Sequence, residues 1–386
     1  MHEEDLVGGY GEVHLPYAFV RKDPHAGTSW EWQYVFPAAK RSIDPRSGVE
    51  RRHHVSHTVL QKVWTNEDDP APTTQFLKDT SRAIIAQNDS PDVGFDTSVN
   101  LYRGCEHGCA YCYARPTHEY LGFSAGLDFE TRIVVKEDAP AMLRQALASP
   151  RWTPRVVAMS GVTDPYQPIE RHLRLTRGCL EVFAEFRNPV AIITKNFLVT
   201  RDLDVLGELA QYQAAAVYLS ITTLHSDVSR PLEPRASHPG RRLAAITALA
   251  QAGVPVGVMV APVIPGLTDH ELPAIIAAAA RAGARYAGYG LVRLPHGVGP
   301  LFEQWLSEHV PTKKAKILKR IQDIHGGRVD DARFGMRMRG QGIFAEQTAA
   351  LFALACRKAD IARTSPPLST AAFRRPAGPQ LALFDL

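Results

Sequence analysis

Three closely spaced cysteines are the part of this sequence best suited to chemistry. In the stretch RGCEHGCAYC they are spaced C-x3-C-x2-C, at Cys105, Cys109 and Cys112. A structural zinc site takes four ligands, usually in two separated pairs, so His107 would have to complete a strained knot. An iron–sulfur cube suits three thiolates better, because cysteine is its usual ligand and one iron keeps an open position. Three structural cysteines in a loop are the remaining alternative.

The elements around these cysteines predict an α/β fold. Apolar, β-branched runs alternate with helical stretches of 10–15 residues, which is typical of parallel βαβ units. Asp138 is a candidate N-cap, with Pro140 in the first turn. Gly253 and Gly283 stand where helices should end before the next strand. The six predicted strands are residues 97–102, 155–160, 189–194, 216–222, 254–262 and 286–293.

Polar residues follow several of these strands, at the ends where parallel α/β folds carry their chemistry. They occupy 160–167, 194–196, Ser220 with Thr222, and 263–269. We expect these side chains to cluster at this end of the sheet. Thr163 and Asp164 also suit a plain turn before Pro165.

The motifs resemble those of a known enzyme superfamily. C-x3-C-x-aromatic-C, with Tyr111 as the aromatic residue, resembles the pattern of radical S-adenosylmethionine (SAM) enzymes. Residues 72–357, with the motifs TDPYQPIE, RPLEPR and APVIPGLTD, resemble a bacterial family related to spore photoproduct lyase and often labelled DNA-repair-like. The resemblance implies a partial (β/α)6 TIM-type barrel, a [4Fe–4S] cluster on the three cysteines, SAM, and an electron donor such as flavodoxin or ferredoxin. It also implies reductive SAM cleavage to a 5′-deoxyadenosyl radical that abstracts hydrogen.

The resemblance also assigns roles to cofactor-binding residues. It places Tyr111 against adenine and lets the backbone of Gly266 approach the adenine closely. Further cofactor contacts, at the ribose or the methionine end, are expected from Thr163, Asp164, Lys195 and Ser220.

The chain departs from spore photoproduct lyase at one chemical step. That enzyme returns a hydrogen atom from a cysteine near the end of its second strand, but no cysteine lies here between Tyr113 and Gly178. Cys179 falls in a helical pattern and suits a core position. Tyr166 is our candidate for the hydrogen relay. Damaged or modified nucleic acid is the leading substrate class. RNA, a peptide or a small metabolite as target, or a non-catalytic iron–sulfur protein associated with DNA, are the alternatives.

The segment that precedes the predicted barrel resembles a different protein family. Residues 7–64 resemble a fragment of an integron-type tyrosine recombinase without its His-x-x-Arg box, so we expect 1–68 to be an irregular, loosely packed remnant without recombinase activity. Because that fragment itself carries His53, His54 and His57, a metal site there is disfavoured. Residues 69–96 then lead into a barrel at 97–300.

After the barrel we predict a helical extension, 301–360, split at Pro311. Its basic residues suit phosphate contacts, with a solvated helix face as the alternative. The flexible tail 361–386 ends in QLALF, Gln380–Phe384, which resembles peptides that dock on the DNA sliding clamp. The basic residues are Lys313, Lys314, Lys316, Lys319, Arg320, Arg328, Arg333, Arg337 and Arg339. Glu233, Arg235 and Arg293 are expected to pair within the barrel or to bind substrate.

Composition narrows the setting. Hydrophobic residues make up 45% and charged residues 22% of the chain, no apolar run reaches the ~20 residues of a membrane span, and the N-terminus lacks a signal-peptide layout. We therefore expect a cytoplasmic protein without membrane contact. A net charge of +4 tolerates a nucleic-acid partner without requiring one.

Overall fold

The computed structural model describes residues 37–43, 50–54, 73–159 and 161–376, in two units. One unit comprises 1–73 and 117–128, and the other comprises 74–116 and 129–386. In the first, strand β1 (Pro37–Ile43) pairs antiparallel with β2 (Glu50–His54). The described part of the recombinase-like segment is therefore a strand pair. We had expected irregular chain there. His57 lies outside the described residues.

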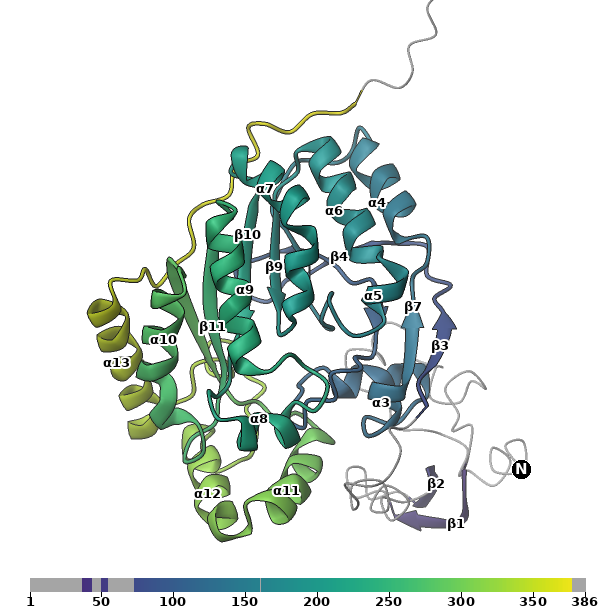
Figure 1. Ribbon diagram of the computed structural model, residues 1–386. Helices are drawn as coiled ribbons and strands as arrows, with labels where there is room; N and C mark the ends of the chain where they lie inside the picture. Colours follow the sequence, from purple (N-terminus) through teal and green to yellow (C-terminus); the bar gives the residue numbers. More distant parts are fainter. Residues whose placement is uncertain (1–36, 44–49, 55–72, 160, 377–386) are drawn as a thin grey trace, which may run out of the picture. The chain divides into compact units, whose positions relative to one another are not determined.

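A parallel sheet forms the centre of the second unit. Within the described residues it has seven strands, in the order β12-β11-β10-β9-β8-β5-β4 (Figure 1). All but the edge strand β4 run parallel, in chain order, as expected for a partial (β/α)6 barrel. The strands are β4 (Ile85–Gln87), β5 (Thr97–Val99), β8 (Val157–Met159), β9 (Val190–Thr194), β10 (Ala215–Ser220), β11 (Val256–Val263) and β12 (Tyr286–Leu291).

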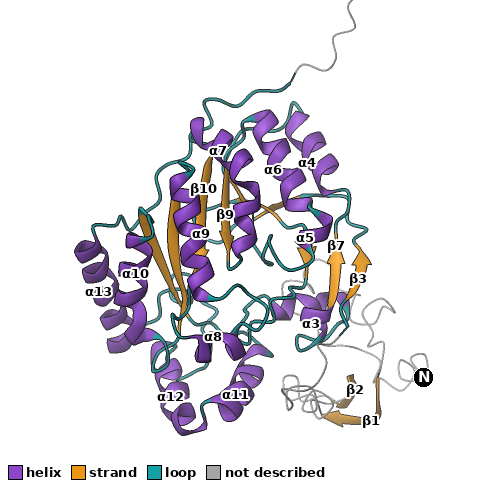
Figure 2. Cartoon of the chain, viewed as in Figure 1, coloured by secondary structure: helices purple, strands orange, loops and turns teal. Residues whose placement is uncertain are grey.

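Helices connect these strands and cover the sheet (Figure 2). The covering helices are α4 (Ala139–Ala148), α6 (Leu175–Phe186), α7 (Leu203–Gln211), α9 (Pro239–Gln251), α10 (Leu272–Arg281) and α13 (Gly342–Ala359). Shorter helices are α3 (Asp128–Thr131), α5 (Glu170–Leu173), α8 (Ser226–Leu232) and the 3-10 turns η4 (Arg115–Leu121), η5 (Phe197–Asp202) and η6 (Asp269–Glu271).

The predicted helix ends are largely confirmed. Gly253 and Gly283 follow α9 and α10 with φ of +73° and +105°, a conformation that favours glycine. Asp138 occupies the N-cap position of α4, but its side chain makes no capping hydrogen bond.

The predicted strand 97–102 is in fact two strands in different sheets. Residues 97–99 form β5 of the large sheet, whereas β6 (Tyr102–Arg103) joins a three-stranded sheet with β7 (Arg132–Val135) and β3 (Gln75–Lys78). An apolar run shows burial but not the bend that separates two sheets. The bend places the cysteines directly after β6.

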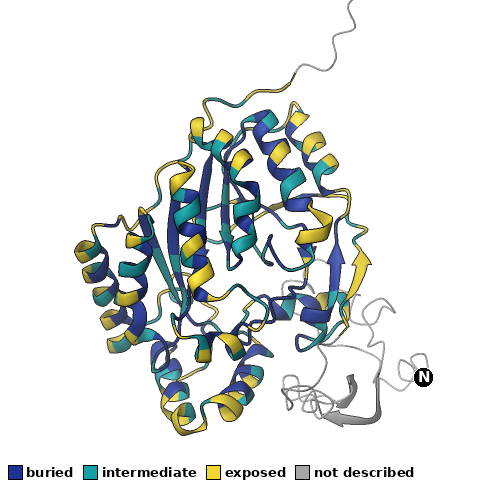
Figure 3. Cartoon of the chain, in the orientation of Figure 1, coloured by how far each residue is buried: buried dark blue, intermediate teal, exposed yellow. Residues whose placement is uncertain are grey.

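The barrel strands and their helices share one apolar core. In Figure 3 the strands are mostly buried, and the exposed residues gather on the outer sides of the helices. Phe352, Ala355 and Cys356 of α13 belong to the same core as Val217 and Val258 of the sheet. The last part of the predicted helical extension is therefore a layer of the barrel and not an appendage.

Two other helices of the extension pack beside the cysteines. As expected, Pro311 separates α11 (Val298–His309) from α12 (Lys314–Ile324), with the short turn η7 (Pro311–Lys313) between them. Phe302, Trp305 and Ile317 from these helices share a second apolar cluster with Cys109 and Tyr111. Part of the cysteine loop is thus buried by chain that lies far away in the sequence.

The described part of the tail, 361–376, is mostly exposed but makes ordered contacts with the barrel, unlike the flexible tether that we predicted for these residues. Ala287 donates its amide to the carbonyl oxygen of Ala362, which continues the sheet beyond β12. Phe373 packs on Phe186 of α6, and Arg374 donates its amide to the Phe186 carbonyl. Gln380–Phe384 lies outside the described residues.

Among the helices that the structure describes, none is both long enough and apolar enough to cross a membrane.

Candidate active site

The cysteine loop runs from Gly104 to Ala114, between β6 and η4. Cys105 and Cys109 are buried, Cys112 is half-buried, and none of them forms a disulfide. Burial raises the pKa of all three thiols, that of Cys109 to about 12. Thiols bind metals as thiolates, so loading of this loop would release protons.

The loop fits a cluster better than a single zinc ion. Within the described residues, no three His, Cys, Asp or Glu side chains converge on one point, and the His107 ring, the candidate fourth zinc ligand, is hydrogen-bonded to Asn196 instead. A cube does not need convergence, because each cysteine binds a different iron. His107 and Cys109 are also buried residues, and their backbone amides have no acceptor among the hydrogen bonds of the described residues. Such donors need a partner, which cluster sulfur would supply.

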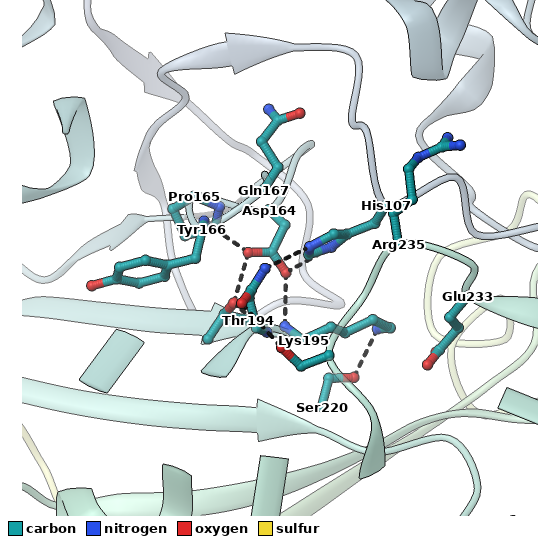
Figure 4. Close-up of polar contacts among 12 residues, drawn as sticks. His107, Asp164, Pro165, Tyr166, Gln167, Thr194, Lys195, Ser220, Glu233 and Arg235 are labelled. Carbon is teal, nitrogen blue, oxygen red and sulfur yellow. Dashed lines mark hydrogen bonds and ion pairs between the residues drawn. The ribbon is translucent and has the colours of Figure 1, made fainter. Parts of the chain in front are cut away.

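His107 attaches the cysteine loop to the ends of two strands. Its Nδ1 lies 3.4 Å from the Asp164 carboxylate (Figure 4). Its Nε2 lies 3.2 Å from Asn196 Nδ2. Burial lowers the pKa of His107 to about 4, so the ring is neutral. Asn196 Nδ2 can only donate, so the imidazole proton is on Nδ1, facing Asp164.

Asp164 is the centre of a polar network after β8 and β9. Its carboxylate accepts hydrogen bonds from the Tyr166 amide (2.9 Å), the Thr194 hydroxyl (2.7 Å) and the Lys195 amide (2.7 Å) (Figure 4). Thr163 donates its hydroxyl to the Tyr102 carbonyl, 3.1 Å away. Thr163 and Asp164 therefore both stabilise the turn. Their contact with a cofactor stays a prediction.

Lys195 and Ser220 lie together, as the strand-end pattern predicted. Lys195 Nζ donates to the Ser220 hydroxyl at 2.9 Å, and Ser220 donates to the Ala261 carbonyl at 3.0 Å. The same ammonium lies 5.8 Å from the centre of the Tyr111 ring. In the described part of the chain its hydrogen-bond partners are neutral oxygens, so its charge remains suited to an anionic group.

Tyr111 belongs to a buried network that the sequence did not reveal. Its hydroxyl donates to the Glu233 carboxylate and lies 3.2 Å from the Thr222 hydroxyl. Glu233 forms an ion pair with Arg242 of α9, and both side chains are almost fully buried. Burial opposes ionisation of Glu233, but the charges of Arg242 and Lys195 outweigh it and hold its pKa at about 2.

Gly266 and Tyr166, two of the predicted site residues, have closely packed surroundings. Gly266 has a φ of +85°, and a Cβ there would lie 3.2 Å from the Arg320 side chain. Tyr166 is fully buried, its hydroxyl is without a hydrogen-bond partner in the described structure, and its ring points away from Asp164 (Figure 4). This burial disfavours a hydrogen relay from Tyr166 to a substrate. The adenine contact of Gly266 stays a prediction.

An exposed aromatic residue lies next to the third cysteine. Tyr113 is 52% exposed and donates its hydroxyl to the Gly161 carbonyl at 3.1 Å. The Arg293 guanidinium lies 5.8 Å from its ring centre, and the Arg293 Nε has no hydrogen-bond partner in the described residues. Phe334 is exposed as well, and the Arg337 guanidinium lies 4.4 Å from its ring.

The predicted basic patch is partly neutralised. Lys314 pairs with Glu303, Lys319 with Asp323, and Arg320 with Asp269. In the following loop, Arg333 pairs with Asp331 and Arg337 with Asp92. Ion pairs of this kind leave less free charge for phosphate than the sequence suggested.

Comparisons with known proteins agree with this geometry. The model of the radical SAM superfamily matches residues 99–279. An uncharacterized protein of Mycobacterium tuberculosis is 43% identical over 236 residues, 60% of this chain and 67% of that protein. An integrase/recombinase of Escherichia coli is 42% identical over 72 residues, which are 19% of this chain and 21% of that protein. That match confirms the predicted recombinase-like fragment.

A solved structure supports the fold. Spore photoproduct lyase complexed with dinucleoside spore photoproduct has a TM-score of 0.55 and 17% identity, over 81% of this chain and 88% of that one. At this identity the likeness concerns the fold alone. The family match counts against the non-catalytic alternative. The chain belongs to the radical SAM superfamily of enzymes.

Proposed function

We propose that this enzyme cleaves SAM reductively and uses the resulting 5′-deoxyadenosyl radical to abstract hydrogen from damaged or modified nucleic acid. The observation that carries the proposal is the position of the cysteine loop. His107 attaches this loop to Asp164 and Asn196, at the carboxyl ends of β8 and β9. The three cysteines therefore lie at the end of the sheet where parallel α/β enzymes bind their substrates.

Cys105, Cys109 and Cys112 would hold the [4Fe–4S] cluster, which supplies one electron to SAM when bound. Lys195 is the candidate partner of the SAM carboxylate, because its ammonium is bonded to neutral oxygens only, among the residues described. Tyr111 and Ser220 flank that ammonium. An electron donor such as flavodoxin or ferredoxin completes the scheme.

Nucleic acid is favoured by the surroundings of Tyr113. A single-stranded nucleic acid binds through bases stacked on aromatic rings and phosphates held by cations. Tyr113 with Arg293 pairs an exposed ring with a guanidinium that forms no ion pair among the described residues, whereas Arg337, beside the exposed Phe334 ring, is already paired with Asp92. The structural relative was solved in complex with dinucleoside spore photoproduct, which is a ligand of the nucleoside class.

A second candidate keeps the radical chemistry and changes the target to RNA, a peptide or a small metabolite. The ion pairs of α12 favour it, because they offset the charge that a long duplex would need. The absence of a cysteine between Tyr113 and Gly178 also favours it, because the hydrogen-returning step of the lyase has no matching thiol there.

The test is release of 5′-deoxyadenosine by anaerobically reconstituted protein with SAM and a strong reductant. Slow release that disappears in Cys109→Ala would support the radical machinery. Lesion-bearing DNA, undamaged DNA and RNA are then compared. Acceleration by the lesion alone supports a repair-like substrate, acceleration by RNA supports the second candidate, and no release from a protein with a full cluster overturns the proposal.

A further inference from the structure

Three charged side chains form a linked group beside the cysteine loop: Arg115, Glu130 and Arg235. Glu130 and Arg115 are almost fully buried, and they pair at 3.1 Å. Arg235 reaches the other oxygen of the same carboxylate. One buried glutamate thus holds two arginines, an arrangement that we call the Glu130 clamp.

The clamp binds carbonyl oxygens of the loop backbone. Arg115 donates from Nη2 to the Gly108 carbonyl and from Nε to the Cys109 carbonyl, both at 3.0 Å. Arg235 donates from Nε to the Glu106 carbonyl. Gly108 has a φ of +66°, and a Cβ there would collide with the Glu130 carboxylate and the Arg235 guanidinium. The clamp and the loop therefore fit closely only with glycine at this position.

The carbonyl groups bound by Arg115 and Arg235 fix the direction of the amide N–H in the same peptide group. A trans peptide group is planar, so its N–H points away from its C=O. The carbonyls of Glu106 and Gly108 face the arginines, so the amides of His107 and Cys109 point away from them. Neither amide has an acceptor within the described residues, although both residues are buried. By contrast, the Ala110 amide, which follows the third held carbonyl, donates to Leu232 at 3.0 Å.

We propose that the Glu130 clamp orients the amides of His107 and Cys109 as hydrogen-bond donors to the sulfurs of the bound cluster. Donors to sulfur stabilise the reduced cluster, which carries one more negative charge, and so raise its reduction potential. Glu130, Arg115 and Arg235 are positioning residues in this scheme. The inference rests on the iron–sulfur assignment and is independent of the substrate.

The test is Glu130→Gln in the reconstituted protein, with the reduction potential measured by anaerobic titration followed by electron paramagnetic resonance. Loss of one negative charge alone would make the potential more positive. Loss of the oriented amides makes it more negative, which is the expected result, together with faster release of iron to a chelator. Glu271→Gln is the matched control. Glu271 is also buried, but it accepts hydrogen bonds from Thr223 and Leu224, which are not part of the cysteine loop.

A potential that is unchanged or more positive in Glu130→Gln overturns the proposal. If that variant fails to assemble a cluster, Arg235→Lys decides, because it keeps the charge but loses the fork that joins Glu130 to the Glu106 carbonyl. A more negative potential in Arg235→Lys supports the clamp, and an unchanged one contradicts it. Absence of any cluster in the wild-type protein would instead contradict the proposed function.

Discussion

Asn196 donates its side-chain amide to Nε2 of His107 across 3.2 Å, and thereby joins the end of β9 to the cysteine loop. The Asn196 oxygen is engaged as well, since it accepts from the Leu198 amide and the Ser237 hydroxyl. The orientation of this amide is therefore set, and so is the tautomer of the imidazole.

Replacement of Asn196 by leucine should loosen the loop. The change leaves the buried Nε2 of His107 without a partner, at a cost of about 1–3 kcal/mol. We expect faster iron loss to a chelator, measured by absorbance. Asn188→Leu is the control, because Asn188 is as buried but bonds to Arg155 and Pro189, away from the loop. Equal iron loss in both variants would point to general destabilisation.

Glu233→Gln should destabilise the fold, because it leaves the buried charge of Arg242 unpaired. Breaking a buried pair on one side costs about 3–5 kcal/mol. The double variant Glu233→Gln with Arg242→Met should recover part of this loss in denaturant unfolding. If the double variant loses as much stability as the two single variants together, or more, the result would contradict the pairing.

The same carboxylate makes stability depend on pH. The folded pKa of Glu233 is about 2, below its unfolded value. The unfolded state therefore binds more protons between these values, and stability falls as the pH drops below about 4.5 towards 2. Glu233→Gln should lose about 2 kcal/mol less than wild type between pH 5 and pH 3, measured by unfolding at each pH. Parallel pH curves for the two proteins would refute this account.

Tyr166→Phe should leave turnover unchanged, which would end the relay hypothesis for Tyr166. The hydroxyl is buried beside the Asp202 carboxylate, and no hydrogen bond of normal geometry joins the two, so its removal should change unfolding by less than about 1 kcal/mol. The measurement is substrate conversion per SAM cleaved. A drop in that ratio in a stable variant would restore Tyr166 as a relay.

Tyr113→Ala should weaken binding of single-stranded nucleic acid. Loss of one base–aromatic stack costs about 1–3 kcal/mol, or roughly 5- to 150-fold in affinity. Phe76→Ala is the control, since Phe76 is 45% exposed on β3. Fluorescence anisotropy with a short labelled strand measures both variants, and equal effects would remove the stacking role.

Deletion of residues 380–386 should abolish binding to a sliding clamp and leave SAM cleavage unchanged. The packing of Phe373 on Phe186 precedes the deletion, so the fold should not change. Surface plasmon resonance on immobilised clamp measures the loss. Equal binding by the truncated and full-length chains would exclude the QLALF motif as the contact.

Patterns with a local physical cause were predictable from the sequence. The alternation of strands and helices, the helix ends at Gly253 and Gly283 and the break at Pro311 follow from periodicity and backbone preference. The proximity of Lys195 and Ser220 followed from the rule that parallel strands end together.

Pairings between distant charged residues were not predictable. Arg115, Glu130 and Arg242 are charged and look like surface residues until the fold supplies their partners. The sequence placed Glu233 and Arg235 together in RPLEPR, yet they pair with Arg242 and Glu130 respectively. Neighbours in a loop point in different directions, and sequence spacing does not record those directions.

The apolar cover of Cys109 has a consequence for biosynthesis. Trp305 and Ile317 follow the cysteines by roughly 200 residues, and a ribosome adds about 5–20 residues per second. The thiols thus emerge many seconds before α11 and α12 exist to shield them. A nascent chain presents an open loop to whatever delivers iron, and completion of the chain closes it. Premature termination before α11 would yield a polypeptide with every cluster ligand and little protection from oxygen.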